Sequence, residues 1–411
     1  MKKTVLREYA RLIIRTGLNI QKGQTLIVRA GLDQPEFVQM VVEEAYKAKV
    51  KAKAKEVIVE WSYQPLTKIH ARYQSLKTMA EVKDWELARL EHYCEVLPAR
   101  LSLLSSDPDG LKGVNMAKIS KAGQMSYPIV KPYHERRENK EQWCVAAVPG
   151  AAWAKKVFPG LPKGKAMEKL WEAILSAARV CDDSVQAWVE HSDNLLSRCN
   201  YLNRLKIRSL HYTAANGTDL TVGMMDVGMW RGGCDRSLQG IEFNPNIPTE
   251  EVFISPKRGL AEGIVHSSMP LSYRGQLIDK FWLRFEGGKA VEVGAEVGEE
   301  ALKEMISMDE GAAYLGECAL VPVDSPISNS GILFYNTLFD ENASCHLAMG
   351  RGYADTIDGF ENRSLAECRE LGLNESMIHV DFMIGCDTMN IDATCADGSV
   401  IRIFENGNWA F

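Results

Sequence analysis

The pattern of apolar residues changes near residue 200, and this change limits the possible folds more than any other feature of the chain. Up to that point, short apolar segments alternate with stretches of helical periodicity, which is typical of a parallel sheet covered by helices on both faces. Beyond it, segments of period two dominate, and Asn216-Gly217 and Asp397-Gly398 predict hairpin turns. The sequence therefore predicts two fold classes in one chain.

The two halves are long enough to form separate domains. A chain of 411 residues fits two domains at roughly 100–200 residues each. We expect residues 1–200 to form an α/β scaffold domain with a parallel, doubly wound sheet. We expect residues 201–411 to form a mainly antiparallel β (α+β) domain. The strands of the first domain are expected at 25–29, 56–61, 101–104 and 143–148.

The charge composition and the first residues argue against several classes of protein. The 48 Lys and Arg residues are outnumbered by 54 Asp and Glu residues, which gives a net charge of −6 and argues against nucleic acid as a partner. Arg7, Glu8 and Arg11 interrupt the apolar residues at the start of the chain, so this segment predicts an amphipathic helix rather than a signal peptide or a membrane anchor. We therefore expect a cytoplasmic protein.

The ten cysteines contain no CxxC pair and are expected to be reduced thiols.

His379 and Asp381 form the clearest chemical feature. Apolar residues alternate with them over 378–384, so both side chains should lie on the same face of a strand. Taking an imidazole and a carboxylate away from water is costly unless something compensates them. The pair therefore indicates mutual bonding, a solvated face or a bound cation.

Several carboxylates occupy similar positions. Glu317 is expected at the mouth of an apolar strand at 319–323, next to Gly316, where another group could approach the backbone closely. Pro248 and Pro256 bracket a short predicted strand in which Glu250 and Glu251 alternate, so only one of the two glutamates is expected to face inward. Each of these glutamates, taken alone, is equally compatible with an ordinary surface position.

His346 and Tyr353 complete the set, although His346 alone could be a satisfied core histidine. Together these residues supply three carboxylates, two imidazoles and a phenol. This mixture of oxygen and nitrogen ligands suits two adjacent divalent ions such as Zn²⁺, Co²⁺ or Mn²⁺. Two such ions activate a water and polarise a carbonyl, which is hydrolytic chemistry.

Four segments of the second half resemble the metal-site segments of the aminopeptidase T/aminopeptidase S/PepS family of two-metal peptidases. Weaker similarities at 143–159 and 217–222 extend the resemblance over most of the chain. One departure is the alternating Lys and Ala at 48–55, where the family has a Gly-containing turn. The four segments are Asn246–Phe253, Leu315–Glu317, His346–Tyr353 and Ile378–Gly385.

The resemblance implies a metal-dependent aminopeptidase that releases N-terminal amino acids from short peptides. The second domain would then be the metal-binding catalytic domain, with two divalent ions (Zn²⁺, Co²⁺, Mn²⁺ or Mg²⁺). The implied metal ligands are Glu251, Glu317, His346, His379 and Asp381.

The resemblance also suggests roles for individual residues. Glu317 is the candidate for the carboxylate that bridges the ions, and Tyr353 is a further ligand or a donor to the oxyanion. One glutamate of the pair Glu250 and Glu251 is an alternative proton shuttle, and Glu251 is preferred as the ligand because it directly precedes Val252.

The resemblance further implies a homodimer with short peptides as substrates, and the charge arguments given above predict neither nucleic acid nor a membrane as a partner. A competing interpretation is a non-catalytic α/β protein that binds a nucleotide or a sugar. That interpretation explains the first half equally well, but it gives the inward carboxylates of the second half no task.

Overall fold

The computed structural model describes residues 1–47 and 53–411. Most of the alternating Lys and Ala segment lies outside these residues. The chain forms two compact units, Met1–Ser192 with Cys234–Thr249, and Asp193–Gly233 with Glu250–Phe411. This division differs from the expected one at residue 200 because residues 234–249 pack with the first unit.

The first unit contains a parallel five-stranded sheet with the strand order β10-β4-β3-β1-β2. All its pairings are parallel, and β2 and β3 lie on opposite sides of β1, which is the doubly wound arrangement. The four predicted strands and their parallel arrangement are therefore confirmed, but the fifth strand, β10, comes from the part of the chain expected to form the second domain. Its strands are β1 (Thr25–Gly31), β2 (Glu56–Ser62), β3 (Ala99–Leu104), β4 (Trp143–Ala147) and β10 (Asn246–Ile247).

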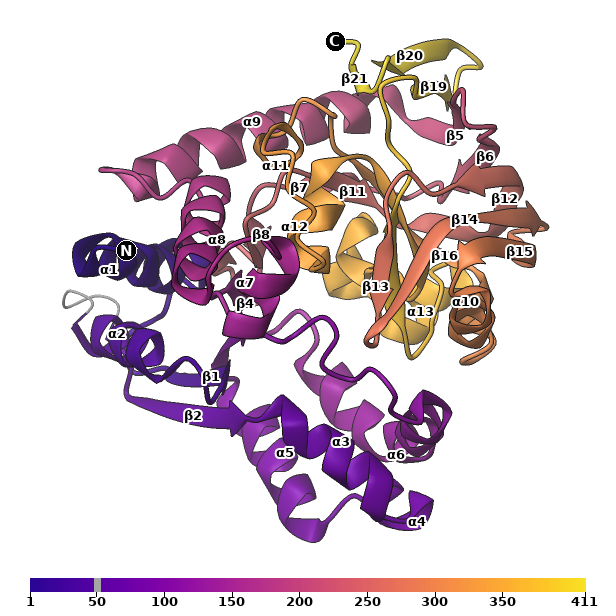
Figure 1. Ribbon diagram of the computed structural model, residues 1–411. Coiled ribbons are helices and arrows are strands. Elements are labelled where there is room, and N and C mark those ends of the chain that lie inside the picture. Colours follow the sequence, from indigo (N-terminus) through magenta and orange to yellow (C-terminus); the bar gives the residue numbers. More distant parts are fainter. Residues whose placement is uncertain (48–52) are drawn as a thin grey trace. The chain divides into compact units, whose positions relative to one another are not determined.

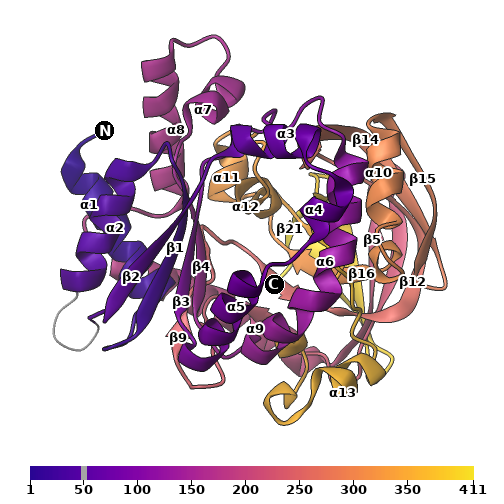
Figure 2. The same cartoon turned by 90° about the horizontal axis from the view of Figure 1, so that it is seen from below.

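Helices cover both faces of this sheet, with α1 and α2 on one face and α5 on the other (Figure 2). A π-helical turn at Ile13–Gly17 continues α1, and α9 runs from the first unit into the second. The helices are α1 (Lys3–Leu12), α2 (Pro35–Lys47), α3 (Gln64–Tyr73), α4 (Leu76–Ala80), α5 (Asp84–Val96), α6 (Met116–Arg137), α7 (Ala151–Val157), α8 (Lys163–Ala177) and α9 (Ser184–Leu205).

The helix α6 is longer than its sequence suggests. Helical periodicity is evident only to about residue 124, but the helix continues through Pro128 and Pro132. Each proline removes one backbone donor, and packing of α6 against α4 and α5 offsets the loss, as tertiary contacts often do.

The second unit contains two antiparallel sheets. The larger one has the order β13-β14-β12-β6-β5-β19-β20-β21, and β15 pairs with β14. The smaller has the order β18-β17-β16-β11-β7. Both agree with the predicted β-rich domain. Figure 1 shows α10 beside β14 and β15, which it contacts.

The strands of the larger sheet are β5 (Ile207–Thr213), β6 (Asp219–Met224), β12 (Pro256–His266), β13 (Leu271–Tyr273), β14 (Gln276–Glu286), β15 (Lys289–Val297), β19 (Asn390–Cys395), β20 (Val400–Glu405) and β21 (Asn408–Trp409). Those of the smaller sheet are β7 (Arg231–Gly232), β11 (Val252–Ile254), β16 (Leu315–Leu320), β17 (His346–Gly350) and β18 (His379–Met383). A two-stranded ribbon in the first unit pairs β8 (Asp235–Arg236) with β9 (Glu242–Phe243).

Short helices connect these strands. They are α10 (Glu299–Ile306), α11 (Pro326–Asn329), α12 (Thr337–Asp340), α13 (Leu365–Glu370) and the 3₁₀ turns Gly311–Ala313, Glu341–Ala343, Ala354–Thr356 and Phe360–Asn362.

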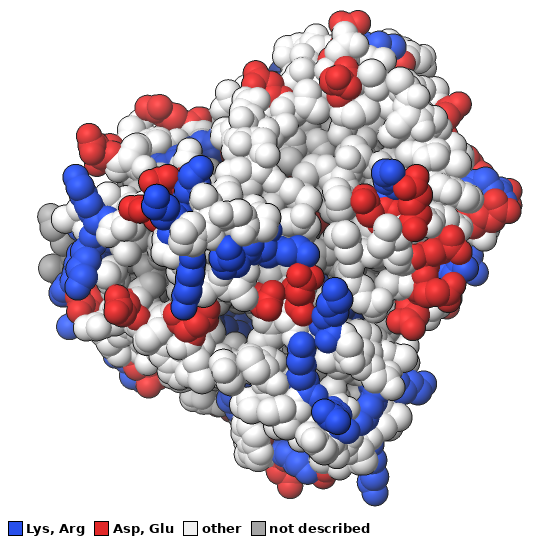
Figure 3. All heavy atoms as spheres, viewed as in Figure 1, with Lys and Arg blue, Asp and Glu red and all other residues white. Residues whose placement is uncertain are grey.

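The ten cysteines all lie in the described part of the chain and all are free, so the expectation of reduced thiols agrees with the structure. Of the helices among the described residues, none combines the length and apolar composition of a bilayer-spanning segment. Positive and negative side chains are interspersed over the face shown in Figure 3.

Gly350 ends β17 at a point where the backbone of the neighbouring segment comes very close. Its φ is +103°, and a Cβ there would lie 2.2 Å from the carbonyl oxygen of Ile378. Gly398 offers a control because its φ is +84° and a Cβ there would meet nothing within 4 Å.

We therefore expect Gly398→Ala to lower the free energy of unfolding by about 1–2 kcal/mol through backbone strain alone. Gly350→Ala should add about 1–3 kcal/mol to that cost through steric overlap. Urea denaturation followed by tryptophan fluorescence measures the difference. Equal costs for the two variants would contradict the close approach of β17 to the segment before β18.

Candidate metal centre

The smaller sheet of the second unit places the predicted residues on one face. Glu317 pairs with Ala348, and Ala348 pairs with Asp381, so these three residues form a row across β16, β17 and β18. Paired residues point to the same side of a sheet, as do residues two apart along a strand. His346 and His379 therefore share the face of Glu317 and Asp381.

The opposite face of the same strands packs into the hydrophobic core. Cys318, Leu347 and Phe382 alternate with the site residues, and all three are fully buried. Ala348, between Glu317 and Asp381, contributes only a methyl group, which leaves room between the two carboxylates.

Two groups of potential ligands result. His346 Nε2 lies 3.0 Å from Glu251 Oε2, while His379 Nε2 lies 2.9 Å from Glu317 Oε2 and 3.1 Å from Asp381 Oδ1. Ligand atoms lie within 4.8 Å of one another in the group Glu251, Glu317 and His346, and likewise in the group Glu317, His379 and Asp381. The two groups share Glu317.

Two buried atoms of the cluster have no hydrogen-bond partner, His346 Nε2 and Asp381 Oδ1. Each lies near an opposite charge without hydrogen-bond geometry. Buried polar atoms are rarely left unpaired, and imidazole nitrogens and carboxylate oxygens are the ligands that borderline divalent ions take. The donor set and these two atoms therefore fit bound cations.

The surroundings of the two histidines raise their pKa values. Burial disfavours the protonated form of His346, but the negative charge of Glu251 beside it outweighs this effect and raises the pKa to about 10. Burial likewise opposes protonation of His379, but the neighbouring carboxylates of Asp381 and Glu317 raise its pKa well above the usual value. A metal ion bound to the Nε2 atoms of His346 and His379 would displace the protons on those two atoms.

The carboxylates respond differently. Burial raises the pKa of Glu317 to about 7 even though His379 acts against the shift. For Asp381, burial favours the neutral form, but the positive charge of His379 beside it outweighs this effect and lowers the pKa. Environments that push the pKa values of neighbouring groups apart are typical of functional sites.

Glu317 lies within β16 rather than at its mouth, because this strand covers Leu315–Leu320 and not the expected 319–323. The register of β16 against β17 shifts between Leu315 and Glu317. At Gly316 a Cβ would lie 2.3 Å from the carbonyl oxygen of Arg351, so the group that approaches the backbone there is the chain itself.

Glu250 and Glu251 are both buried, at 7% and 8% exposure. Both residues precede β11, so the strand alternation expected for them does not decide which one faces the cluster. The side chain beside His346 is that of Glu251. The backbone N–H of Glu250 donates to Asn342 Oδ1 at 2.7 Å.

Tyr353 packs against the cluster. The centroid of its ring lies 4.7 Å from that of His379, and its backbone N–H donates to Ser255 Oγ at 2.8 Å. Burial raises the pKa of the phenol, so the group keeps its proton at neutral pH.

Glu341 is a member of the cluster that the sequence did not reveal. It is buried at 8% exposure, and its pKa lies well above the usual value because of burial and of the charges on Asp381 and Glu251. Asn342 Nδ2 donates to its Oε1 at 3.3 Å. Glu341 begins a 3₁₀ turn, and the period-two patterns that drew attention to the other residues do not extend into such a turn.

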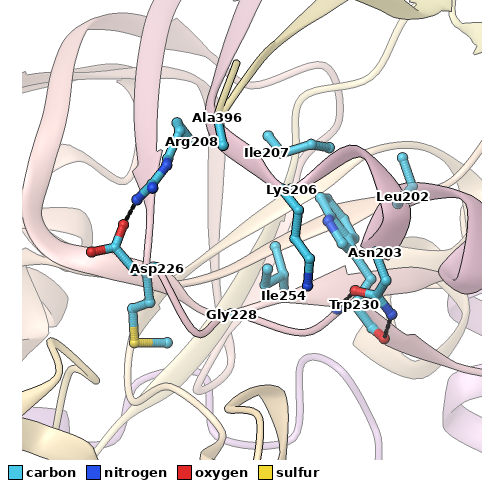
Figure 4. A pocket seen from close by; sticks show the side chains of 11 residues that line it. Leu202, Asn203, Lys206, Ile207, Arg208, Asp226, Gly228, Trp230, Ile254 and Ala396 are labelled. Atoms are coloured by element: carbon cyan, nitrogen blue, oxygen red, sulfur yellow. Dashed lines mark hydrogen bonds and ion pairs between the residues drawn. The ribbon is translucent and has the colours of Figure 1, made fainter. Parts of the chain in front are cut away.

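A separate pocket of the second unit lies around the junction of α9 and β5 (Figure 4). Arg208 and Asp226 form an ion pair beside it. Its lining residues, all in the described part of the chain, include none of the cluster described above. The pocket is therefore not part of the candidate metal centre.

Comparison with known proteins agrees with this geometry. The model of the family described as thermophilic metalloprotease (M29) matches residues 2–409. Aminopeptidase AmpS of Bacillus subtilis (strain 168) is 44% identical over 408 residues, covering 99% of this chain and 98% of the relative. Aminopeptidase T of Thermus aquaticus is 38% identical and covers 98% of each chain.

A solved structure shows the same relationship. Wild-type AmpT from Thermus thermophilus superposes with a TM-score of 0.88 at 37% identity, and the match covers 100% of both chains. The chain therefore belongs to the thermophilic metalloprotease family, M29.

Proposed function

We propose that this M29 metallo-aminopeptidase releases N-terminal amino acids from short peptides with two divalent ions bound. Glu251, Glu317 and His346 would hold one ion, and Glu317, His379 and Asp381 would hold the other. The observation that carries the proposal is that Glu317 belongs to both groups, because a carboxylate shared by two ions is what a two-metal hydrolase requires.

The ligand set suits Zn²⁺, Co²⁺ or Mn²⁺, and Mg²⁺ is a further possibility. When bound, two such ions would activate a water and polarise the scissile carbonyl. Selective binding of the free α-amine restricts cleavage to the first peptide bond, and the buried carboxylates of Glu250 and Glu251 supply negative charge for that amine.

The chain's own residues would move the protons. Glu341 is our candidate for proton transfer, because it is buried close enough to Asp381 and Glu251 for their charges to act on it, and Asn342 donates a hydrogen bond to its carboxyl group. It replaces the pair Glu250 and Glu251 as our preferred proton shuttle. Tyr353, protonated and beside His379, would donate a hydrogen bond to the developing oxyanion.

Three similarities to the M29 relatives favour this function over a non-catalytic nucleotide- or sugar-binding protein: the family match, the shared fold and the aminopeptidase names of the relatives. The buried carboxylates of the second unit would have no task in a protein of the alternative class.

We also propose that the protein is cytoplasmic and that it is a homodimer, the second of which its resemblance to the family implies. Sedimentation equilibrium should then give twice the chain mass of 45.9 kDa. A mass of one chain at micromolar concentration would contradict the dimer.

Removal of metal tests the proposed function. Exhaustive chelation should abolish hydrolysis of an amino-acid p-nitroanilide, and added Zn²⁺, Co²⁺ or Mn²⁺ should restore it. Glu317→Gln should reduce activity by at least about 100-fold, because it weakens the ligand shared by both ions. Glu370→Gln removes the same charge from an exposed position and should have no effect. Full activity after chelation would overturn the proposal.

Glu341→Gln separates proton transfer from metal binding. The substitution keeps the shape of the side chain, so the metal content should match that of the wild type. The value of kcat should fall by about 10²–10⁴-fold, which is the usual contribution of a general acid or base. A variant with normal kcat would remove Glu341 from the mechanism and return the role to Glu250 or Glu251.

A further inference from the structure

We propose that Asn374 is a positioning residue for His379. It fixes the backbone carbonyl of Arg351, and this carbonyl determines which imidazole nitrogen faces the metal centre. The inference rests on the proposed function, because only a histidine that binds an ion needs one defined nitrogen.

His379 contacts the backbone of Arg351. Nδ1 of His379 lies 2.6 Å from the carbonyl oxygen of Arg351. A carbonyl oxygen only accepts, so Nδ1 carries a proton and donates. Nε2 is then the nitrogen that faces Glu317 and Asp381, at 2.9 and 3.1 Å. Histidines that bind metals usually donate their other N–H in this way.

Asn374 holds the chain on both sides of Arg351. Its side chain is 1% exposed, and Nδ2 donates to the carbonyl oxygen of Gly350 at 2.6 Å. Its backbone oxygen accepts from the N–H of Gly352 at 2.9 Å, and the N–H of Arg351 donates to the oxygen of Ile378 at 2.7 Å. The carbonyl group of Arg351 accepts the hydrogen bond of His379, and the residues before and after Arg351 are both held by hydrogen bonds to Asn374.

The same carboxamide ties this segment to a second loop. Nδ2 of Asn374 also donates to the carbonyl oxygen of Gly311 at 2.9 Å. Close by, the carboxylate of Asp309 accepts from Ser376 Oγ at 2.8 Å and from the N–H of Met377 at 2.5 Å. Because two buried carbonyl oxygens depend on one amide group, a shorter side chain such as serine cannot serve both.

Asn203 provides a matched control in the same unit. Its carboxamide also binds backbone groups, donating to the oxygen of Trp230 at 3.2 Å and accepting from its N–H at 2.8 Å (Figure 4). It contacts no residue of the proposed metal centre through these bonds. Loss of its hydrogen bonds should therefore affect stability without affecting metal affinity.

In the experiment, metal is first removed from the protein with a chelator, and the protein is then titrated with Zn²⁺ in competition with a chelator of known affinity. The titration measures the dissociation constants of the two zinc sites in each chain. The wild type, Asn374→Ser, Asn203→Ser, His379→Ala and the double variant Asn374→Ser with His379→Ala are compared. We expect Asn374→Ser to weaken one of the two zinc sites by about 10–100-fold and to leave the other unchanged. Asn203→Ser should leave both unchanged.

The double variant tests whether Asn374 acts through His379. If it does, the double variant should bind Zn²⁺ no more weakly than His379→Ala alone, because the two losses are not additive. Wild-type affinities in Asn374→Ser, equal weakening of both sites, or additive losses would overturn the inference while leaving the two-metal proposal intact. A wild type that binds no Zn²⁺ would overturn both.

Asn374→Asp covers the case in which the serine variant does not fold. Aspartate keeps the size of the side chain but has no donor for the two carbonyl oxygens at pH 8, so the same selective loss is expected. In the zinc-loaded wild type, ¹⁵N NMR of labelled histidine should also show His379 with its proton on Nδ1. A proton on Nε2 would overturn the inference without any variant.

Discussion

Burial of like charges on one sheet face is the constraint on which the rest of the second unit depends. Glu251, Glu317 and Asp381 all have less than a tenth of their surface exposed. Carboxylates at such close quarters repel one another and lose their hydration, which is costly unless cations compensate. The imidazoles of His346 and His379, whose pKa values are raised by these carboxylates, offset part of that cost. Divalent ions would supply more charge at the same positions.

The smaller sheet accommodates this charge because its two faces have opposite characters. One face carries the ionisable groups, while Cys318, Leu347 and Phe382 anchor the other in the core. A cluster built on adjacent strands is held more rigidly than one built on loops. The loop segments that complete it are tied down by buried amides, with Asn342 beside Glu250 and Glu341 and with Asn374 beside Gly350.

Strand periodicity is a local signal, and it predicted the parallel sheet and the β-rich character of the second unit, whereas the full ligand set was implied by the resemblance to the aminopeptidase family. His379 and Asp381 stood out because residues two apart share a face, and the structure brings them together as expected. The bounds of β16 were less accurate, since its six residues are all buried and show no alternation. Glu341 was missed because its burial comes from tertiary packing around a 3₁₀ turn, for which the sequence has no periodic pattern.

The central claim is that two divalent ions share Glu317, and anomalous scattering measured at the zinc edge on crystals of the zinc-loaded protein tests it most directly. The account predicts two peaks per chain, one among Glu251, Glu317 and His346 and the other among Glu317, His379 and Asp381, at the roughly 3.5–4 Å separation of two-metal hydrolases. A single peak, or two peaks of which one lies away from Glu317, would contradict it.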